Sequence, residues 1–179
     1  FRLTTTRACR VLTPIGWLVL LVTFSLVLVL SMLFSHQFLA PTKSVKGEIL
    51  VVEGWLPDYA LGEIKQRFEK EEYRLLVTTG GRIETGLHLS EYKTWASLTA
   101  ARLNKLGIPL EKIISTSQSV INKKDRTYYS VLALNEKFKK DNLLVKSMDV
   151  VSLGVHARRT WFLYKKVFAS VSVGIIAIE

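Results

Sequence analysis

Residues 48–58 read EILVVEGWLPD, in which a short apolar run ends in a glutamate, a turn and the start of a helical pattern. The same succession of apolar run, turn and helical spacing repeats along the chain. Four further runs of strand length are Arg74–Thr79, Ile113–Ser115, Met148–Leu153 and Val171–Ile178. Because these runs are rich in Val, Ile and Leu without strict alternation, we expect strands that are buried on both faces.

Helical spacing fills the intervals between the runs, with apolar residues three and four positions apart. The four helical stretches are 59–72, 92–106, 125–140 and 157–169. Strands that alternate with helices form right-handed βαβ units and a parallel sheet. The sequence therefore predicts an α/β fold, in which residues 47–179 form a five-stranded, doubly wound, Rossmann-like parallel sheet.

A long apolar segment precedes that domain. Residues Ile15–Phe34 form a run of twenty positions without a charge, which matches a hydrocarbon core of roughly 30 Å. A cleaved signal peptide is the alternative, but its apolar core is usually only about 7–15 residues long. We therefore predict an N-terminal cytoplasmic arm at 1–14, one transmembrane helix at 15–34 and a linker at 35–46. The chain begins with Phe1 rather than Met, as expected of a trimmed or incomplete N-terminus.

The charges around this segment predict its orientation in the lipid bilayer. Arg2, Arg7 and Arg10 precede the apolar run, and no acidic residue occurs before Glu48. Segments that stay in the cytoplasm are enriched in Lys and Arg. We therefore expect a single-pass protein with a cytoplasmic N-terminus and a domain on the outer face of the membrane.

Composition narrows the classes of function. The 179 residues carry a formal net charge of +10 and one cysteine, Cys9. One cysteine excludes an internal disulfide, thiol catalysis in the outer domain and a multi-cysteine metal site. A basic outer domain suits anionic lipid headgroups, phosphate-bearing glycans or an acidic partner. Nucleic acid is not an expected partner, because a domain outside the cytoplasm rarely meets it.

The unusual residues of the chain gather where the predicted strands end. Ligands of open parallel sheets bind beyond the carboxyl ends of the strands. Four distant segments bring nine candidate residues to that edge: Glu53, Gly80, Gly81, Asp125, Arg126, Thr127, His156, Arg158 and Arg159. Acids, an imidazole, guanidinium groups and a glycine turn at one rim predict a site for an anionic ligand.

Several candidates also have an ordinary structural explanation. Gly80 and Gly81 either make a strand-to-helix turn or let backbone N–H groups approach a phosphate. Both explanations stay open, because the sequence contains no GxGxxG or Walker pattern that would favour phosphate binding. Asp125 fits a helix N-cap, with Thr127 in the first turn. Arg126 in a first turn opposes the helix dipole, and a bound anion would offset that mismatch.

The remaining candidates also have both a structural and a functional explanation. An exposed position on the helix surface is the alternative explanation for His156, Arg158 and Arg159. Glu53 is harder to explain structurally, because a carboxylate at the end of a buried strand needs a partner or a function. His36 and His88 have no neighbours that indicate metal ligation, so we predict no metal site and assign no cofactor.

Taken in order, four segments resemble the ElyC/SanA/YdcF-like family of bacterial envelope proteins: EGWLPDYAL (53–61), TTGG (78–81), DRT (125–127) and HARR (156–159). The resemblance covers essentially the whole predicted domain. It implies a membrane-anchored, Rossmann-like domain on the periplasmic face of a bacterial inner membrane, linked to cell-envelope integrity and to peptidoglycan or exopolysaccharide metabolism. Relatives tend to continue with a Trp-containing segment and a final helix, so we expect the far wall of the pocket to be missing or supplied by a partner.

Two hypotheses about function remain open. In the first, the domain is an enzyme that acts on a phosphate- or pyrophosphate-linked lipid or glycan precursor. Arginines and the glycine backbone would hold the anion. His156 would donate a proton to a leaving oxygen, and Glu53 would act as a base or hold a divalent cation. In the second, the domain is a non-catalytic accessory or scaffold subunit that binds a membrane-protein partner.

Overall fold

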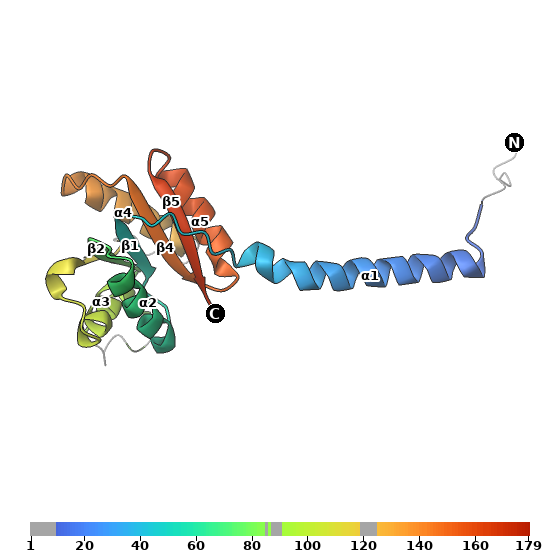
Figure 1. The fold of residues 1–179 in the computed structure, drawn as a ribbon, viewed down its shortest axis with the longest axis horizontal. Coiled ribbons are helices and arrows are strands. Elements are labelled where there is room, and N and C mark those ends of the chain that lie inside the picture. Colours follow the sequence, from blue (N-terminus) through green and yellow to red (C-terminus); the bar gives the residue numbers. More distant parts are fainter. Residues whose placement is uncertain (1–9, 85, 87–90, 119–124) are drawn as a thin grey trace, which may run out of the picture. The chain divides into compact units, whose positions relative to one another are not determined.

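The computed structural model describes residues 10–84, 86, 91–118 and 125–179, in two compact units divided between His36 and Gln37. The first unit contains most of one long helix, and the second contains a sheet with helices on both faces (Figure 1). Cys9, His88 and most of the arm predicted at 1–14 lie outside the described residues.

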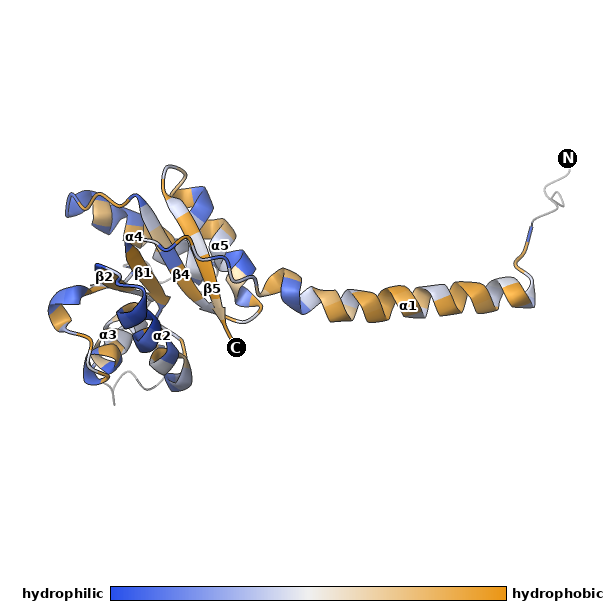
Figure 2. Cartoon of the chain, viewed as in Figure 1, coloured by the Kyte–Doolittle hydropathy of each residue, from blue (hydrophilic) through white to orange (hydrophobic). Residues whose placement is uncertain are grey.

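Helix α1 (Pro14–Leu39) has 26 residues, none of them buried, and Figure 2 shows a mostly hydrophobic ribbon. Its start follows from local chemistry, because the Thr13 hydroxyl accepts a hydrogen bond from the Gly16 N–H at 3.1 Å and a proline takes the first helical position. At 1.5 Å per residue the helix exceeds a hydrocarbon core of roughly 30 Å. Its length and composition thus allow it to cross a membrane, and the predicted span of 15–34 lies within it.

The second unit contains the five-stranded parallel sheet that the sequence predicts, in the Rossmann-like order β3-β2-β1-β4-β5. The strands are β1 (Ile49–Glu53), β2 (Leu75–Thr79), β3 (Ile113–Thr116), β4 (Ser147–Leu153) and β5 (Ser172–Ile178). The connecting helices are α2 (Asp58–Lys70), α3 (Trp95–Lys105), α4 (Arg126–Lys140) and α5 (His156–Val167), with a short 3-10 helix η1 (Leu110–Lys112) before β3. The chain runs outward from β1 to β3, then crosses back to β4 and β5, so that β1 and β4 lie side by side.

Alternate side chains of β1 enter two hydrophobic clusters, one on each face of the sheet. Leu50 and Val52 pack with residues of α2 and α3, whereas Ile49 and Val51 pack with residues of α4 and α5. All four side chains are fully buried. The unbroken apolar run therefore reflects a strand covered on both faces, and the prediction of a doubly wound sheet is confirmed.

The second half of the segment predicted as a linker (35–46) bonds to the edge of the sheet. Helix α1 continues to Leu39, and Lys43 then forms an antiparallel bridge with Ile175 of β5. The Lys43 N–H donates to the Ile175 carbonyl at 2.7 Å, and the Ile175 N–H donates back at 3.0 Å. This pairing covers part of the otherwise open edge of β5. The residues after α1 are thus part of the domain rather than a free tether.

Asp149 in β4 holds the same segment through a fully buried carboxylate. It accepts four hydrogen bonds, from the Val45 N–H (2.8 Å), the Gly47 N–H (2.9 Å), the Ser44 hydroxyl (2.8 Å) and the Tyr73 hydroxyl (3.0 Å). Its neighbour on β5 is Gly174, where a Cβ would lie 1.9 Å from Asp149 Oδ1. The buried carboxylate of Asp149 is tolerated because these four donors hydrogen-bond to its two oxygens.

We predict that Asp149→Ala lowers the free energy of unfolding by about 3 kcal/mol, because the buried Gly47 N–H and the half-buried Val45 N–H lose their acceptor. Urea denaturation of the full chain in detergent micelles, followed by tryptophan fluorescence, measures the change. The control is Asp141→Ala, which removes a carboxylate that is 40% exposed and pairs with Lys137; it should cost less than about 1 kcal/mol. Equal losses in the two variants would show that Asp149 does not hold the segment.

Candidate functional site

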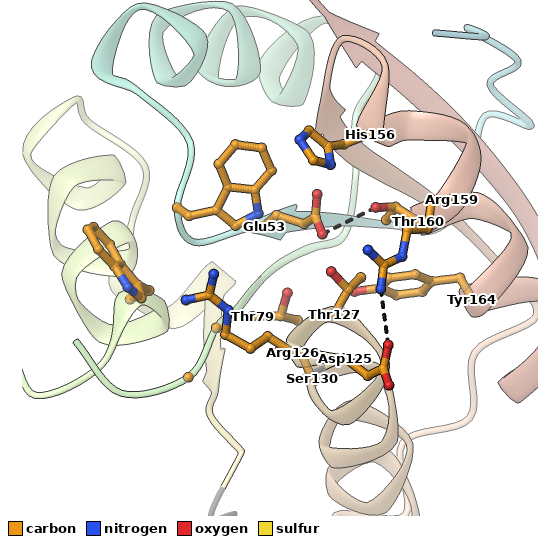
Figure 3. Close-up of a pocket in the computed structure, with 14 residues that line it drawn as sticks. Glu53, Thr79, Asp125, Arg126, Thr127, Ser130, His156, Arg159, Thr160 and Tyr164 are labelled. Carbon is orange, nitrogen blue, oxygen red and sulfur yellow. Dashed lines mark hydrogen bonds and ion pairs between the residues drawn. The ribbon is translucent and has the colours of Figure 1, made fainter. Parts of the chain in front are cut away.

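A pocket of about 520 Å³ opens at the carboxyl edge of the sheet (Figure 3). It lies where the strand order reverses between β1 and β4, which is the usual ligand site of doubly wound sheets. Its lining residues are Glu53, Trp55, Thr79, Gly80, Gly81, Trp95, Asp125, Arg126, Thr127, Ser130, His156, Arg159, Thr160 and Tyr164. The structure therefore brings together eight of the nine candidates from the sequence, and Arg158 alone among them is outside the pocket.

Glu53 ends β1 with its carboxyl group directed into the pocket, although the residue is only 5% exposed. The Ser152 hydroxyl donates to Glu53 Oε2 at 2.5 Å, and the Thr160 hydroxyl donates to Oε1 at 3.3 Å. Burial raises the pKa of Glu53 from 4.5 to about 7, against the opposing effects of hydrogen bonds from Ser152, Thr160 and Trp55 and of the Arg159 charge. Glu53 can therefore take up or release a proton near neutral pH.

Asp125 occupies the N-cap position of α4, as the sequence predicts, but its side chain does not cap the helix. Its backbone adopts the left-handed conformation (φ 55°, ψ 35°), and its Oδ1 instead accepts a hydrogen bond from the Arg159 guanidinium at 3.2 Å. Both side chains are more than half exposed. The pair ties the start of α4 to the start of α5 across the pocket.

The N-termini of α4 and α5 place positive partial charges at the pocket, which also contains the carboxyl groups of Glu53 and Asp125. Neither α4 nor α5 has an acidic residue in its first turn, although acids are favoured there by the helix dipole. Arg126 begins α4 and forms no ion pair within the part of the chain that the structure describes. Figure 3 shows the guanidinium groups of Arg126 and Arg159 on two sides of the cavity, with Glu53 facing the space between them. This arrangement suits an anion.

Gly80 and Gly81 are explained mainly by close packing. A Cβ on Gly80 would lie 2.8 Å from the Trp95 Cβ, so the end of β2 and the start of α3 can approach only because this residue is a glycine. The Gly80 N–H donates to the Thr116 carbonyl at 3.3 Å, and the Gly81 carbonyl accepts the Trp95 N–H at 2.9 Å. Gly80 therefore shapes the pocket wall, and its N–H is already engaged rather than free to hold an anion.

His156 and Arg158, two residues apart on α5, have different surroundings. The exposed imidazole of His156 lies at the pocket mouth and packs edge-on against Trp55, with ring centroids 5.4 Å apart. Arg158 lies away from the pocket, where its guanidinium stacks on the Phe38 ring at 3.9 Å and donates to the Phe38 carbonyl. The expectation that Arg158 contributes to the rim is therefore not met, because its side chain leaves the helix in another direction.

Several pocket residues carry no role in the sequence analysis. Thr160 and Tyr164 lie one and two steps of four residues after His156, so all three share one face of α5. That spacing could have been read from the sequence. Burial together with the charge of Glu53 raises the pKa of the Tyr164 phenol, against the opposing effect of the Thr79 side chain. Ser152, which holds Glu53, has no comparable signal, because it belongs to a different strand.

Potential metal ligands do not cluster in the described part of the chain, where no three His, Cys, Asp or Glu side chains come together. Glu53 and Asp125 line the same pocket, but the Asp125 carboxylate is engaged by Arg159. The chemistry that the geometry offers is thus anion binding by two guanidinium groups beside a carboxyl group that titrates near neutrality.

We predict that Glu53 makes the domain less stable as pH rises from about 4.5 to about 7. Its pKa is raised in the folded state, so the neutral acid is tolerated at low pH, while above pH 7 the folded protein must bury a charge. This linkage is worth about 3 kcal/mol. Glu53→Gln removes it, so the stability of the variant relative to wild type should rise by that amount between pH 4.5 and pH 8 in urea denaturation. Parallel pH profiles for the two proteins would contradict the raised pKa; Glu63→Gln, on an exposed face of α2, is the control.

No protein-family model matches this chain, and no curated protein sequence matches it. The resemblance to the envelope family stays a prediction that these comparisons do not test.

Proposed function

We propose that this protein is a membrane-anchored envelope protein whose α/β domain binds a phosphate-bearing lipid or glycan precursor and acts on it. The observation that carries the proposal is the placement of Arg126 and Arg159 on two sides of a pocket that also contains Glu53. Two cations beside a carboxyl group with a pKa of about 7 suit phosphate chemistry better than the binding of a neutral ligand.

The anion would lie between the guanidinium groups at the start of α4. Guanidinium groups match phosphate oxygens with paired N–H donors, and the uncapped N-terminus of α4 adds a favourable dipole. Arg159 can give up its contact with the exposed Asp125 at little cost, because exposed ion pairs are weak. Trp55, which is 39% exposed beside His156, offers an apolar surface to the group attached to the phosphate.

The reaction we propose is hydrolysis of a phosphate or pyrophosphate linkage. Ionised Glu53 takes a proton from a water molecule, whose oxygen forms a new bond to phosphorus. The bond from phosphorus to the leaving oxygen breaks, and His156 at the pocket mouth gives that oxygen a proton. The guanidinium groups stabilise the charge that develops on the phosphoryl oxygens. The proton lost by water is accepted by one pocket residue, Glu53, and the proton gained by the leaving oxygen is donated by another, His156.

The proposed setting is the outer face of a bacterial inner membrane, with a single membrane crossing by α1. Support comes from the length and apolar character of that helix and from the Arg-containing segment before it. The resemblance to the ElyC/SanA/YdcF-like family supports a role in cell-envelope biogenesis. A substrate carried on a lipid would share the membrane with its enzyme.

We predict that the full chain in detergent binds inorganic pyrophosphate, and that Arg126→Ala and Arg159→Ala each raise the Kd by about tenfold or more, because each removes a charge-assisted contact. Isothermal titration calorimetry measures the affinity. Arg74→Ala is the matched control, since Arg74 precedes β2 at the opposite edge of the sheet and its side chain is 55% exposed. Wild-type affinity in both pocket variants would refute the site.

A second prediction separates an enzyme from a binding module. With a labelled lipid-pyrophosphate sugar as substrate, Glu53→Gln should lower kcat by about 100-fold or more while leaving pyrophosphate affinity within a few-fold of wild type. Glu63→Gln on α2 is the control and should change neither quantity. Tight binding without turnover by the wild-type chain would favour the accessory-subunit hypothesis instead.

A further inference from the structure

The outward face of α5 combines cations with an exposed aromatic ring. Phe162 lies four residues after Arg158, and Lys165 and Lys166 lie three and four residues after Phe162, so they form one stripe along the helix; we call these four residues the outer stripe. The Phe162 side chain is 66% exposed, and both lysines are exposed. Figure 2 shows hydrophilic and hydrophobic residues mixed along this helix.

The charges of the outer stripe are not balanced by nearby acids. Its three cations form no ion pair within the described ranges of the chain. Helix α5 and residues 37–47 together contain no Asp or Glu. Apart from Arg159, which pairs with Asp125 at the pocket, their basic residues are Lys43, Lys46, Arg158, Lys165 and Lys166. The outer stripe therefore carries a net positive charge.

Lys165 of the outer stripe packs on the ring of Trp161, and a hydrogen bond holds that ring in place. The Trp161 indole donates to the Val173 carbonyl at 2.7 Å, which fixes its ring between α5 and β5. Lys165 Nζ lies 4.0 Å from the centre of that ring, and Lys43 Nζ lies 5.9 Å from it. A lysine that packs on an ordered ring has fewer side-chain conformations, so its ammonium group keeps its place on the surface.

The stripe begins where the chain leaves α1. Phe38, in the last turn of that helix but within the same compact unit as the domain, contacts Arg158 through its ring and its carbonyl. Phe38 lies four positions after Phe34, the end of the predicted span, a helical distance of about 6 Å. Chain connectivity alone thus keeps Arg158 close to the point where the polypeptide would enter a bilayer.

We propose that the outer stripe of α5 docks on anionic lipid headgroups. Helices that lie at a membrane surface combine Lys and Arg with an inserted Phe or Trp, and each basic residue near an anionic surface adds roughly fivefold to the affinity. The stripe has both components and lies next to the membrane entry point. This inference is independent of the proposed function, because none of its four residues lines the pocket.

Lysine acetylation of the full chain in nanodiscs tests the docking. Lys165 and Lys166 should react at least about threefold more slowly in discs containing anionic phosphatidylglycerol than in neutral phosphatidylcholine discs, and about 0.5 M salt should abolish the difference. The exposed Lys70 on α2 and Lys140 on α4 should react equally in both lipids. Mass spectrometry reports each site separately.

A pair of matched variants makes the test specific. Phe162→Ser should remove most of the protection in anionic discs, whereas Leu144→Ser, at a side chain that is 89% exposed between α4 and β4, should leave it intact. Rates for Lys165 and Lys166 that do not differ between the two lipids would overturn the proposal. Protection that persists in high salt would also overturn it, since that would indicate contact with something other than a charged lipid surface.

Discussion

The central constraint on this domain is the burial of β1 on both faces of the sheet. Its four apolar side chains alternate between two cores, so the strand cannot shift by one residue without exchanging those cores. The strand ends at Glu53, whose carboxyl group therefore has a fixed position next to β4, at the reversal of strand order. The other residues that line the pocket surround that buried acid.

Burial of Glu53 costs free energy, and the surroundings offset only part of it. Hydroxyl groups from β4 and α5 donate to its two oxygens, yet desolvation still dominates and raises the pKa to about 7. A residue selected for stability alone would be apolar at this position. Helix α5, which contributes the Thr160 hydroxyl to Glu53, also brings Arg159 to the pocket, and α4 brings Arg126.

The residues that follow His36 are attached to the rest of the domain by hydrogen bonds and by a ring contact. Residues 42–47 bond to β5 and to the buried Asp149, and Phe38 contacts Arg158 on α5. Arg158 and Arg159 are adjacent, so the cationic face of α5 and the pocket mouth share one helical turn. A domain docked through α5 would hold its pocket close to lipid, where a lipid-carried phosphate is found.

The sequence by itself determined the apolar helix α1, the alternation of strands and helices, and the parallel sheet, because each rests on a local hydrophobic period. It also determined that Glu53, Asp125, Arg126 and His156 meet at one edge, since strand ends converge in any parallel sheet. Tertiary structure alone decided the finer contacts. Adjacent side chains of a helix diverge by about 100°, so Arg159 reaches the pocket while Arg158 reaches Phe38. The Asp125 side chain turned to Arg159, the Gly80 N–H to Thr116 and the Glu53 oxygens to Ser152 and Thr160; each partner is distant along the chain, and no local pattern encodes such a contact.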